Sequence, residues 1–500
     1  MMAPMLLNND KYEHARQTRD PRFDGRFFVG VLTTGIYCRP VCPVRVPKKE
    51  NVQLYPTAAA AAEAGFRPCL RCRPETSPGT PAWQGSSWKV SRALQLIERG
   101  LVDDGSIDEL AEQLDIGARQ LSRLFKQHIG ASPVTVAQTR RLHFAKQLID
   151  ETDLPMTDIC FAAGFGSVRR FNAVFRSVYD RTPLALRKGR KGEIKPDSSI
   201  LIPLSYRPPF DWRAMLGFLS TRAVPGMEAV SEDSYSRTIS LEGKTGDFCA
   251  RFSNNENRLW LSIRFPDTRQ LLRIVDQVRR LFDLRADSNE IDRYLGRDPQ
   301  LKPLIKNYPG LRVPGCWDGL EIAVRAVIGQ QVSVKGASTL MARVVERLGS
   351  SYSADGGKLY RVFPTPSQLI NGDLNGLGIT GLRIEAIKTL ARQVEAGQLL
   401  MDGRMDTETF VRNICQIKGI GEWTGQYIAL RALNDPDAFP HGDLVLQQVG
   451  GWPGDRLTAK QLLENAEAWK PWRAYAVMLL WKLAQQVKQQ GTNQLRLKSG

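Results

Sequence analysis

The chain has 500 residues with a formal net charge of +17, and 42% of its residues are hydrophobic. This length is too great for one core, so we expect several domains, and the composition excludes a disordered chain. The positive excess favours a polyanion, most often nucleic acid, as the partner. A basic but merely solvated surface also fits the charge alone.

No targeting or membrane segment is evident. The stretch MMAPMLLNNDKYEHARQ lacks a basic region followed by a long apolar run, which argues against a signal peptide, and no run of about 18 uncharged apolar residues occurs. Four of the eight cysteines are clustered; the single ones are Cys160, Cys249, Cys316 and Cys415. Without a secretion signal, the cluster is better interpreted as metal ligands than as disulfides. We expect a cytoplasmic protein that does not bind membranes.

Residues 1–80 are loop-rich, with short β-like runs such as FFVGVLTTGIYC. They contain four cysteines, in the pattern C-x3-C followed by C-x2-C: Cys38, Cys42, Cys69 and Cys72. Zinc takes four such ligands in a tetrahedron, and each close pair supplies half of them, so we predict one Zn²⁺ per chain. The metal could serve only to fold a small, core-poor domain. Alternatively a thiolate could react, because four thiolates keep negative charge on the site and remain nucleophilic.

Basic residues surround this cluster and suit a phosphate partner: Arg39, Arg45, Arg67, Arg71 and Arg73. TTGIYCRPVCPVR together with GFRPCLRCRP closely resembles the amino-terminal domain of the Ada adaptive-response family, which repairs methyl phosphotriesters in DNA. The resemblance implies that Cys38 is both a zinc ligand and a nucleophile. It would take the methyl group by in-line displacement and keep it as a thioether, so each molecule reacts once. The resemblance also implies that Thr34, Arg45 and Arg67 contact the DNA backbone.

Helical periodicity runs from Trp88 to about Arg187, between linker-like stretches at 77–87 and 189–199. A helix–turn–helix pattern, with its turn at 115–117, returns with a turn near 164–167. The second helix of such a motif lies in the major groove, where Arg and Gln read base edges. The candidate residues are Arg119, Gln120 and Arg123 in the first copy, and Arg169, Arg170 and Asn172 in the second. Two copies joined by the long helix TVAQTRRLHFAKQLID resemble the AraC-type DNA-binding domain, which in the Ada family follows the zinc domain directly.

An electrostatic argument links these two parts. Methylating Cys38 removes one negative charge from the zinc cluster and reduces its repulsion from the DNA backbone. One charge at ~4–6 Å and an effective dielectric of ~20 is worth roughly 3–4 kcal/mol as an unscreened upper bound. Repair would then act as the signal for transcription, as the family resemblance implies.

The segment 203–265 mixes the helix DWRAMLGFLSTRA with alternating strands, which indicates an α+β unit. Residues 271–483 are helical again. Within them IKGIGEWTGQYIALRA places Gly419 and Gly421 in a turn between two helices, whose backbone N–H groups can hold a phosphate. Asp443 follows in AFPHGDLVLQQ.

This combination resembles the helix-hairpin-helix glycosylase superfamily, and more closely the AlkA-type 3-methyladenine DNA glycosylase over about 205–483. The resemblance implies that Asp443 stabilises positive charge at C1′ or activates water. It implies that Trp423, Tyr427 and Trp481 line a pocket in which aromatic faces attract a cationic base by ~0.5–2 kcal/mol. Taken singly, each aromatic ring also fits a core. Gln331 stands where relatives insert a Leu wedge between the bases.

Three motifs that the sequence lacks narrow the class of glycosylase. Superfamily members that also cut the strand carry a Lys where this chain has Trp423, and no cysteine follows Cys415, so there is no carboxy-terminal iron–sulfur pattern. The PCHR motif of O6-alkylguanine transfer is also missing. We therefore expect base removal without strand cleavage.

The sequence thus predicts a mainly α multidomain protein. The expected domains are a zinc methyl-transfer α+β domain at 1–80, an AraC-type domain at 86–190, a small α+β domain at 200–285 and a helix-hairpin-helix glycosylase domain at 286–490. The expected partners are double-stranded DNA, both alkylated and promoter, and RNA polymerase, with the chain a monomer. Two alternatives stay open: a regulator whose glycosylase half only docks on DNA, and a zinc-stapled transcription factor without methyl transfer.

Overall fold

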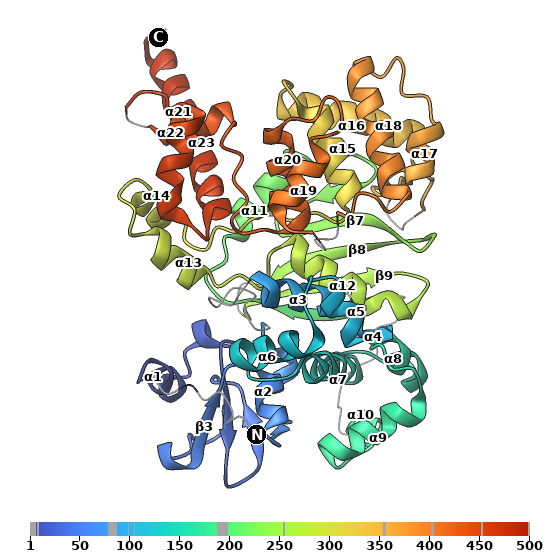
Figure 1. The fold of residues 1–500 in the computed structure, drawn as a ribbon, viewed down its shortest axis with the longest axis vertical. Coiled ribbons are helices and arrows are strands. Elements are labelled where there is room, and N and C mark those ends of the chain that lie inside the picture. The colour runs from blue at the N-terminus through green and yellow to red at the C-terminus, as the bar shows by residue number, and fades with distance from the viewer. Residues whose placement is uncertain are drawn as a thin grey trace. The chain divides into compact units, whose positions relative to one another are not determined.

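The computed structural model describes residues 7, 10–78, 88–98, 100–104, 106–187, 199–253, 256–353, 357–401, 405–451 and 454–498. It is mainly helical with two small sheets (Figure 1), which confirms the predicted fold class. The predicted linkers at 77–87 and 189–199 lie almost wholly outside the described residues. No helix in the described ranges is both long and apolar enough to cross a bilayer.

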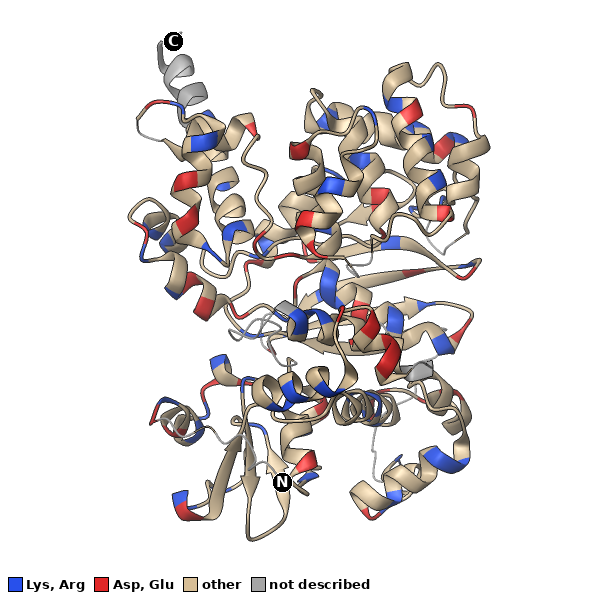
Figure 2. Ribbon diagram, viewed as in Figure 1, with Lys and Arg blue, Asp and Glu red and all other residues tan. Residues whose placement is uncertain are grey.

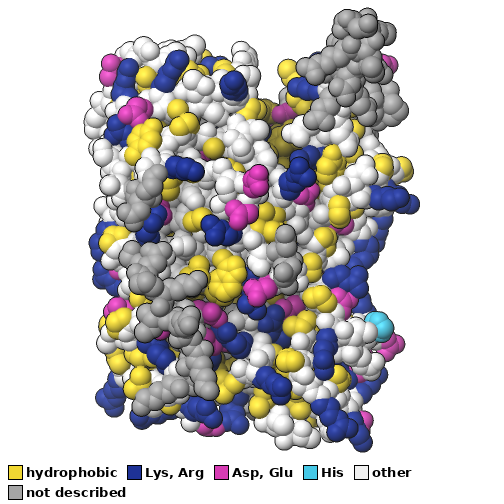
Figure 3. Space-filling model, turned by 180° about the vertical axis from the view of Figure 1, so that it is seen from behind, with side chains coloured by type: hydrophobic (Ala, Val, Ile, Leu, Met, Phe, Trp, Pro, Cys, Tyr) yellow, Lys and Arg dark blue, Asp and Glu magenta, His cyan; other side chains and the backbone are white. Residues whose placement is uncertain are grey.

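Two compact units make up the chain. Unit 1 comprises Met1–Pro208, Leu241–Arg279 and Leu284–Ala286, and unit 2 comprises Pro209–Ser240, Arg280–Asp283 and Asp287–Gly500. Lys and Arg residues occur throughout both units (Figure 2). On the face shown in Figure 3 their side chains are dispersed among acidic and apolar ones and do not form one patch.

A four-stranded sheet of order β3-β1-β2-β4 begins unit 1. Its strands are β1 (Phe28–Val31), β2 (Ile36–Cys38), β3 (Val52–Tyr55) and β4 (Arg67–Pro68), accompanied by the helices α1 (Asp10–Thr18) and α2 (Ala58–Glu63). β1 and β2 lie within the β-like run FFVGVLTTGIYC and form an antiparallel hairpin. β2 pairs with β4 in parallel, so the chain leaves both strands at the same edge of the sheet. Cys38 and Cys69 stand at this edge.

Eight helices follow within the described part of residues 88–187. They are α3 (Trp88–Glu98), α4 (Leu101–Asp104), α5 (Ile107–Glu112), α6 (Ala118–Ile129), α7 (Pro133–Glu151), α8 (Met156–Ala162), α9 (Val168–Tyr179) and α10 (Pro183–Arg187). The pairs α5–α6 and α8–α9 are the two predicted helix–turn–helix motifs, and α7 joins them. Left-handed backbone at Asp115 (φ 50°) and Gly164 (φ 78°) makes the two tight turns. Apolar side chains at helical spacing, such as Leu121 and Phe125, are fully buried.

Unit 1 ends with an antiparallel strand set in which β9 (Arg258–Arg264) lies between β5 (Ile200–Ser205) and β8 (Lys244–Ser253). Alternate residues of β9 are buried, as expected for a sheet with one apolar face. Helix α12 (Leu271–Leu281) follows. The short 3₁₀ turns of this unit are Pro21–Phe23, Lys49–Asn51, Pro74–Thr76 and Thr268–Gln270.

Where the structure describes it, unit 2 is helical apart from the hairpin of β6 (Glu228–Val230) and β7 (Ser234–Leu241). Its helices are α11 (Trp212–Ser220), α13 (Ser288–Leu295), α14 (Leu301–Asn307), α15 (Gly319–Gly329), α16 (Val334–Leu348), α17 (Pro366–Asn371), α18 (Gly381–Glu395), α19 (Thr407–Ile414), α20 (Glu422–Ile428), α21 (Leu444–Gly450), α22 (Ala459–Ala466) and α23 (Arg473–Lys498). Helix α20 continues into a π-helical turn at Ala429–Leu433, and a 3₁₀ turn occupies Glu467–Trp469. Almost every residue of α15 is buried, so this helix is central to the unit's core.

A buried ion network ties α15 to the β6–β7 hairpin. The Arg237 guanidinium donates to Glu321 over 2.6 Å, and both side chains are at most 5% exposed. Arg325 donates to Glu321 over 3.0 Å and to Glu228 over 2.6 Å. Burial raises the pKa of Glu321, but Arg237 and Arg325 outweigh burial and lower it. The carboxylate is therefore charged and fully paired.

We expect Glu321→Ala to destabilise unit 2 by about 3–5 kcal/mol, because it leaves Arg237 buried without its partner. Since the pKa of Glu321 is lowered from 4.5 in the folded protein, its contribution is complete above about pH 4.5 and is lost as the pH falls through the lowered value. Urea unfolding at neutral and acid pH measures this. Glu346→Ala, which removes an exposed Arg–Glu pair with Arg361, is the matched control and should leave the midpoint unchanged. Equal losses in the two variants would contradict the expectation.

Candidate metal centre and aromatic pocket

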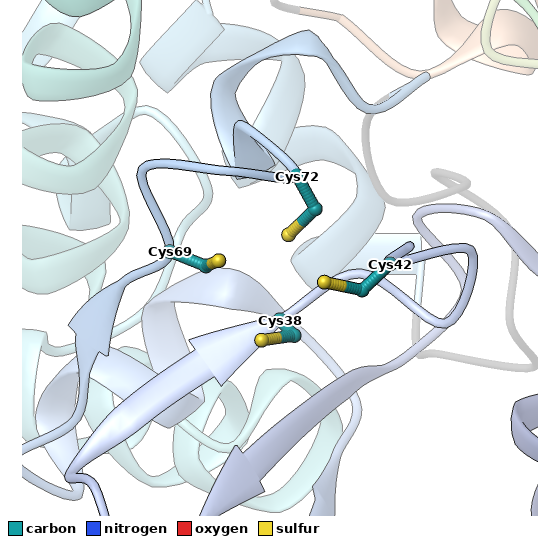
Figure 4. Close-up of side chains that lie close together, drawn as sticks. All are labelled: Cys38, Cys42, Cys69 and Cys72. Atoms are coloured by element: carbon teal, nitrogen blue, oxygen red, sulfur yellow. The ribbon is translucent and has the colours of Figure 1, made fainter. Parts of the chain in front are cut away.

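The four clustered cysteines form one compact site. Cys38 ends β2 and Cys69 directly follows β4, while Cys42 and Cys72 come from the loops that continue these strands. All four sulfur atoms lie within 4.8 Å of one another, and Figure 4 shows them grouped around one centre. Each residue is only 7–8% exposed. Four sulfur ligands in this arrangement are a structural zinc donor set, and the cluster is the protein's zinc site.

The sulfurs are crowded enough to change each other's protonation. Hydrogen bonds with Cys38, Cys42 and Cys72 lower the pKa of Cys69. The pKa of Cys42 falls to about 7, mainly through its hydrogen bond with Cys38. The Arg39 backbone N–H donates to Cys72 Sγ over 3.3 Å. Hydrogen bonds within the cluster raise the pKa of Cys38 and of Cys72 instead. The sulfurs alone therefore favour two thiolates, and a bound metal ion is needed to hold all four in the deprotonated form that it binds.

Some of the basic residues around the cysteine cluster are paired within the protein, and others are exposed to solvent. Arg39 is mostly buried and donates to Asp24 Oδ1 over 2.9 Å. Arg73 contacts Glu151 at 2.5 Å and Asp150 at 3.0 Å, both on α7. Both guanidiniums are used in pairs inside the protein, so they do not fit the prediction that they bind a phosphate.

Three of the remaining candidates, Thr34, Arg45 and Arg71, are exposed. Arg67 is also exposed but forms an ion pair with Asp180, which follows α9. Contact of Thr34, Arg45 and Arg67 with the DNA backbone stays a prediction.

The strand that carries Cys38 is anchored to α7. The Tyr37 hydroxyl and His143 Nε2 are 2.7 Å apart, and burial lowers the pKa of His143 to about 4, so the ring is neutral. Thr57 Oγ1 donates to the Ile129 carbonyl over 3.0 Å. Within unit 1 the zinc sheet and the helix–turn–helix helices are therefore packed together.

The predicted base readers stand at the starts of α6 and α9. Arg119, Gln120 and Arg123 are exposed on α6, as are Arg169 and Arg170 on α9. Both sets lie on the solvent faces of helices whose other faces enter the core. Asn172 is half-buried, and its amide donates to the Val168 carbonyl of its own helix over 2.9 Å. The geometry is suited to groove binding, and the base contacts themselves stay predictions.

The Gly-x-Gly turn lies where the sequence places it. It connects α19 to α20, which lie side by side (Figure 1). Gly419 has φ +94°, a conformation that favours glycine, and Gly421 precedes α20 as its N-cap. Both glycines are exposed, and no side chain caps this helix end. A phosphate oxygen can therefore reach the first N–H groups of α20.

Asp443 and three aromatic rings meet at one cavity of about 420 Å³ within unit 2. Trp423 and Tyr427 stack at 5.8 Å between ring centroids, and Tyr427 lies 6.3 Å from Trp481. Phe218 of α11 stacks on Trp481 at 6.4 Å. The structure thus brings together all three predicted pocket aromatics.

The Asp443 carboxylate is fixed by three donors. Oδ1 accepts from the backbone N–H groups of Val445 (2.9 Å) and Leu446 (3.0 Å), which makes Asp443 the N-cap of α21. Oδ2 accepts from the Trp423 indole Nε1 over 2.9 Å. The Trp423 ring, which lines the cavity, therefore also orients the Asp443 carboxylate.

Sequence reasoning missed two arginines in this cavity. Arg431 donates to the Tyr427 hydroxyl over 3.0 Å, and Arg222 lies over the Phe218 ring at 3.8 Å. Burial raises the pKa of Tyr427, but Arg431 and Arg222 outweigh burial and lower it. Burial lowers the pKa of Arg222 itself. Arg222 follows Phe218 by four positions, a spacing typical of any helix, so no local signal pointed to this cavity.

The fold and the two sites define a multidomain zinc protein with DNA-binding motifs and a glycosylase-type pocket. Residues 11–75 match the metal binding domain of Ada, residues 110–189 a helix-turn-helix domain, and residues 201–318 the AlkA N-terminal domain. The chain is 40% identical over 471 residues to the probable bifunctional transcriptional activator/DNA repair enzyme AlkA of Mycobacterium tuberculosis (strain H37Rv), covering 93% of this chain and 95% of that protein. It belongs to that family.

Two further relatives resemble the carboxy-terminal part. DNA-3-methyladenine glycosylase 2 of Escherichia coli (strain K12) is 36% identical over 281 residues, which are 56% of this chain and 95% of that enzyme. The solved 3-methyladenine DNA glycosylase from Archaeoglobus fulgidus superposes with a TM-score of 0.52 at 22% identity, over 57% of this chain and 98% of that one. The latter likeness establishes the fold of this region.

We expect elemental analysis of the purified protein to find one zinc per chain. The reason is that four buried sulfurs within 4.8 Å of one another form a complete donor set. Thiol titration under native conditions should then leave Cys42, Cys69 and Cys72 unreactive until a chelator is added. A protein without zinc, with all four thiols open to the reagent, would contradict this.

Proposed function

We propose that this protein is a fused sensor, transcription activator and base-excision enzyme for alkylated DNA. The observation that carries the excision half is the Asp443 carboxylate, held by the Trp423 indole at a cavity lined by three aromatic rings. The proposed domains are the zinc methyl-transfer domain (1–80), the AraC-type domain (86–190), the small α+β domain (200–285) and the glycosylase domain (286–490). The thiols of the zinc site suit the reducing cytoplasm.

Cys38 is the proposed methyl acceptor. Its sulfur attacks the methyl carbon of a phosphotriester, the S–C bond forms as the C–O bond breaks, and the electron pair leaves with the phosphate oxygen. The products are a thioether and an ordinary phosphodiester, so each molecule reacts once. Cys38, Cys42, Cys69 and Cys72 would hold the zinc ion, whose positive charge would keep the Cys38 thiol deprotonated at neutral pH. Thr34, Arg45 and Arg67 would hold the backbone around the reacting phosphate.

The methylated state carries less negative charge beside the DNA backbone. The accessible side chains on α6 and α9 then read promoter bases, and the bound protein recruits RNA polymerase as a monomer. Loss of one charge at ~4–6 Å is worth up to roughly 3–4 kcal/mol before screening, and each 1.4 kcal/mol is about tenfold in affinity. Repair thereby raises promoter occupancy.

Excision uses the aromatic cavity. A flipped base enters between the rings, whose faces favour an electron-poor base. The glycosidic bond breaks with its electron pair moving to the cationic base, and Asp443 stabilises the positive charge that develops at C1′ until water adds there. Trp423 stands where strand-cutting relatives place a lysine, so no covalent amine intermediate forms and the strand stays intact. Phosphates flanking the flipped nucleotide would rest on the amides near Gly419 and Gly421.

The acceptor assignment is tested by mass spectrometry after incubation with DNA that contains methyl phosphotriesters. One extra methyl group should appear on the peptide that contains Cys38, because resemblance singles out this sulfur among the four. The buried Cys160 peptide serves as an internal control and should stay unmodified. A methyl group on Cys69 or Cys72 would assign the reaction to the other arm of the cluster, and no methyl group at all would favour a purely structural zinc.

The excision assignment is tested with Asp443→Asn, which keeps the volume and the capping of α21 but removes the negative charge. Release of 3-methyladenine under single-turnover conditions should fall by about 10²–10⁴-fold, because the charge acts on the transition state. DNA binding in gel shifts and transfer to Cys38 should persist. Asp455→Asn, an exposed carboxylate beyond α21, is the matched control.

Wild-type release by Asp443→Asn would remove the catalytic assignment. No release by the wild-type chain would favour the alternative in which this half only docks on DNA.

A further inference from the structure

The loop between α15 and α16 is attached to the glycine turn by one side chain. Gln330 Nε2 donates to the Gly419 carbonyl over 2.9 Å and to Thr424 Oγ1 over 3.0 Å. The Arg383 guanidinium donates to the Gln330 backbone carbonyl. Gln330 is half-buried, whereas its neighbour Gln331 is exposed. The two adjacent glutamines therefore have different surroundings: one contacts the protein and the other faces solvent.

The backbone conformation of Gln331 indicates that these hydrogen bonds constrain the loop. Its φ is +52°, in the left-handed region, although it is not glycine. A residue in this conformation costs roughly 1–3 kcal/mol and persists only where surrounding contacts impose it. The contacts of Gln330 lie immediately before it, and Ser333 caps α16 just after it. The backbone that carries the exposed Gln331 is thus held from both sides.

The same amide also reaches the base cavity. Thr424 follows Trp423, whose indole donates to Asp443, and the Thr424 side chain is buried at 2% exposure. Gly419 belongs to the turn proposed to hold the DNA backbone. Hydrogen bonds from Gln330 therefore connect three parts of unit 2: the loop bearing Gln331, the glycine turn and the helix that carries the stacking ring.

We propose that Gln330 is a positioning residue, which couples insertion of Gln331 into the base stack to placement of the flipped base against Trp423 and Asp443. This inference rests on the proposed excision activity. Base flipping leaves a gap in the duplex and costs a few kcal/mol. A side chain that fills this gap must therefore be placed at the position that the flipped base has vacated. An error of about 1 Å in such placement costs on the order of 100-fold in rate. Removing the amide frees the loop from the turn and leaves the buried Thr424 hydroxyl without this donor.

The test compares Gln330→Ala with the wild-type full-length protein on two DNA probes. Release of 3-methyladenine from methylated duplex should slow by about 10- to 100-fold under single-turnover conditions. A second duplex carries a tetrahydrofuran abasic analogue beside 2-aminopurine, whose fluorescence rises when the stack is opened. Its rise should fall to less than about half, while the gel-shift Kd changes by less than about threefold, because phosphate contacts dominate affinity.

Three further variants separate positioning from general damage. Thr424→Val removes one of the two Gln330 acceptors and should give a smaller defect, non-additive with Gln330→Ala because the two residues share a bond. Gln331→Ala should reproduce the fluorescence defect. Gln416→Ala removes an exposed amide that donates to the Arg412 carbonyl and should behave as wild type.

Normal release and fluorescence in Gln330→Ala would overturn the inference while leaving the excision activity in place. Loss of binding together with a lowered melting temperature would overturn it in favour of a structural role. No release by the wild-type protein would instead reject the proposed excision, since the fluorescence arm reports stack opening without any chemistry.

Discussion

Four sulfur atoms within 4.8 Å of one another cannot all be thiolates unless a cation is bound between them. The first domain depends on this constraint. Its sheet has only short strands, and its apolar core is divided between small clusters on the two faces. The parallel pairing of β2 with β4 brings Cys38 and Cys69 to the same edge of the sheet. Zinc supplies the stability that so small a core does not, and Cys38, the proposed methyl acceptor, is one of its four ligands.

Residues next to the zinc ligands contact helix α7, which joins the two helix–turn–helix motifs. Tyr37, next to Cys38, contacts the neutral His143 of α7. Arg73, next to Cys72, contacts carboxylates of α7. Both neighbours of the zinc ligands thus rest on the helix that separates the two helix–turn–helix motifs. Cys38 and the second helix of each helix–turn–helix motif therefore belong to one packed unit.

Unit 1 also includes part of the glycosylase-like sequence, and an ion network centred on the buried Asp276 holds it there. Asp276 of α12 accepts from Arg140 of α7 over 2.5 Å and from Arg285 over 2.9 Å. Arg285 also donates to Glu98 of α3 over 2.5 Å. Breaking such a network costs more than breaking an exposed pair, because the Asp276 carboxylate would be left buried without its partners. The regulatory helices and the β5–β9–β8 strands are consequently one packed unit, although they match different families.

The sequence by itself determined the fold class, the zinc ligands, both helix–turn–helix motifs and the glycine turn. Each of these depends on local patterns: cysteine spacing, helical periodicity and residues that favour left-handed turns. Resemblance added Asp443 and the three pocket aromatics, and the structure brings these four together at one cavity. Only the tertiary structure showed that Arg39 and Arg73 are paired internally, that Arg222 and Arg431 enter the cavity, and that Gln330 contacts the glycine turn. These contacts join residues far apart in the chain, and the sign and spacing of a charged residue do not reveal which distant carboxylate, ring or carbonyl the folded chain will place beside it.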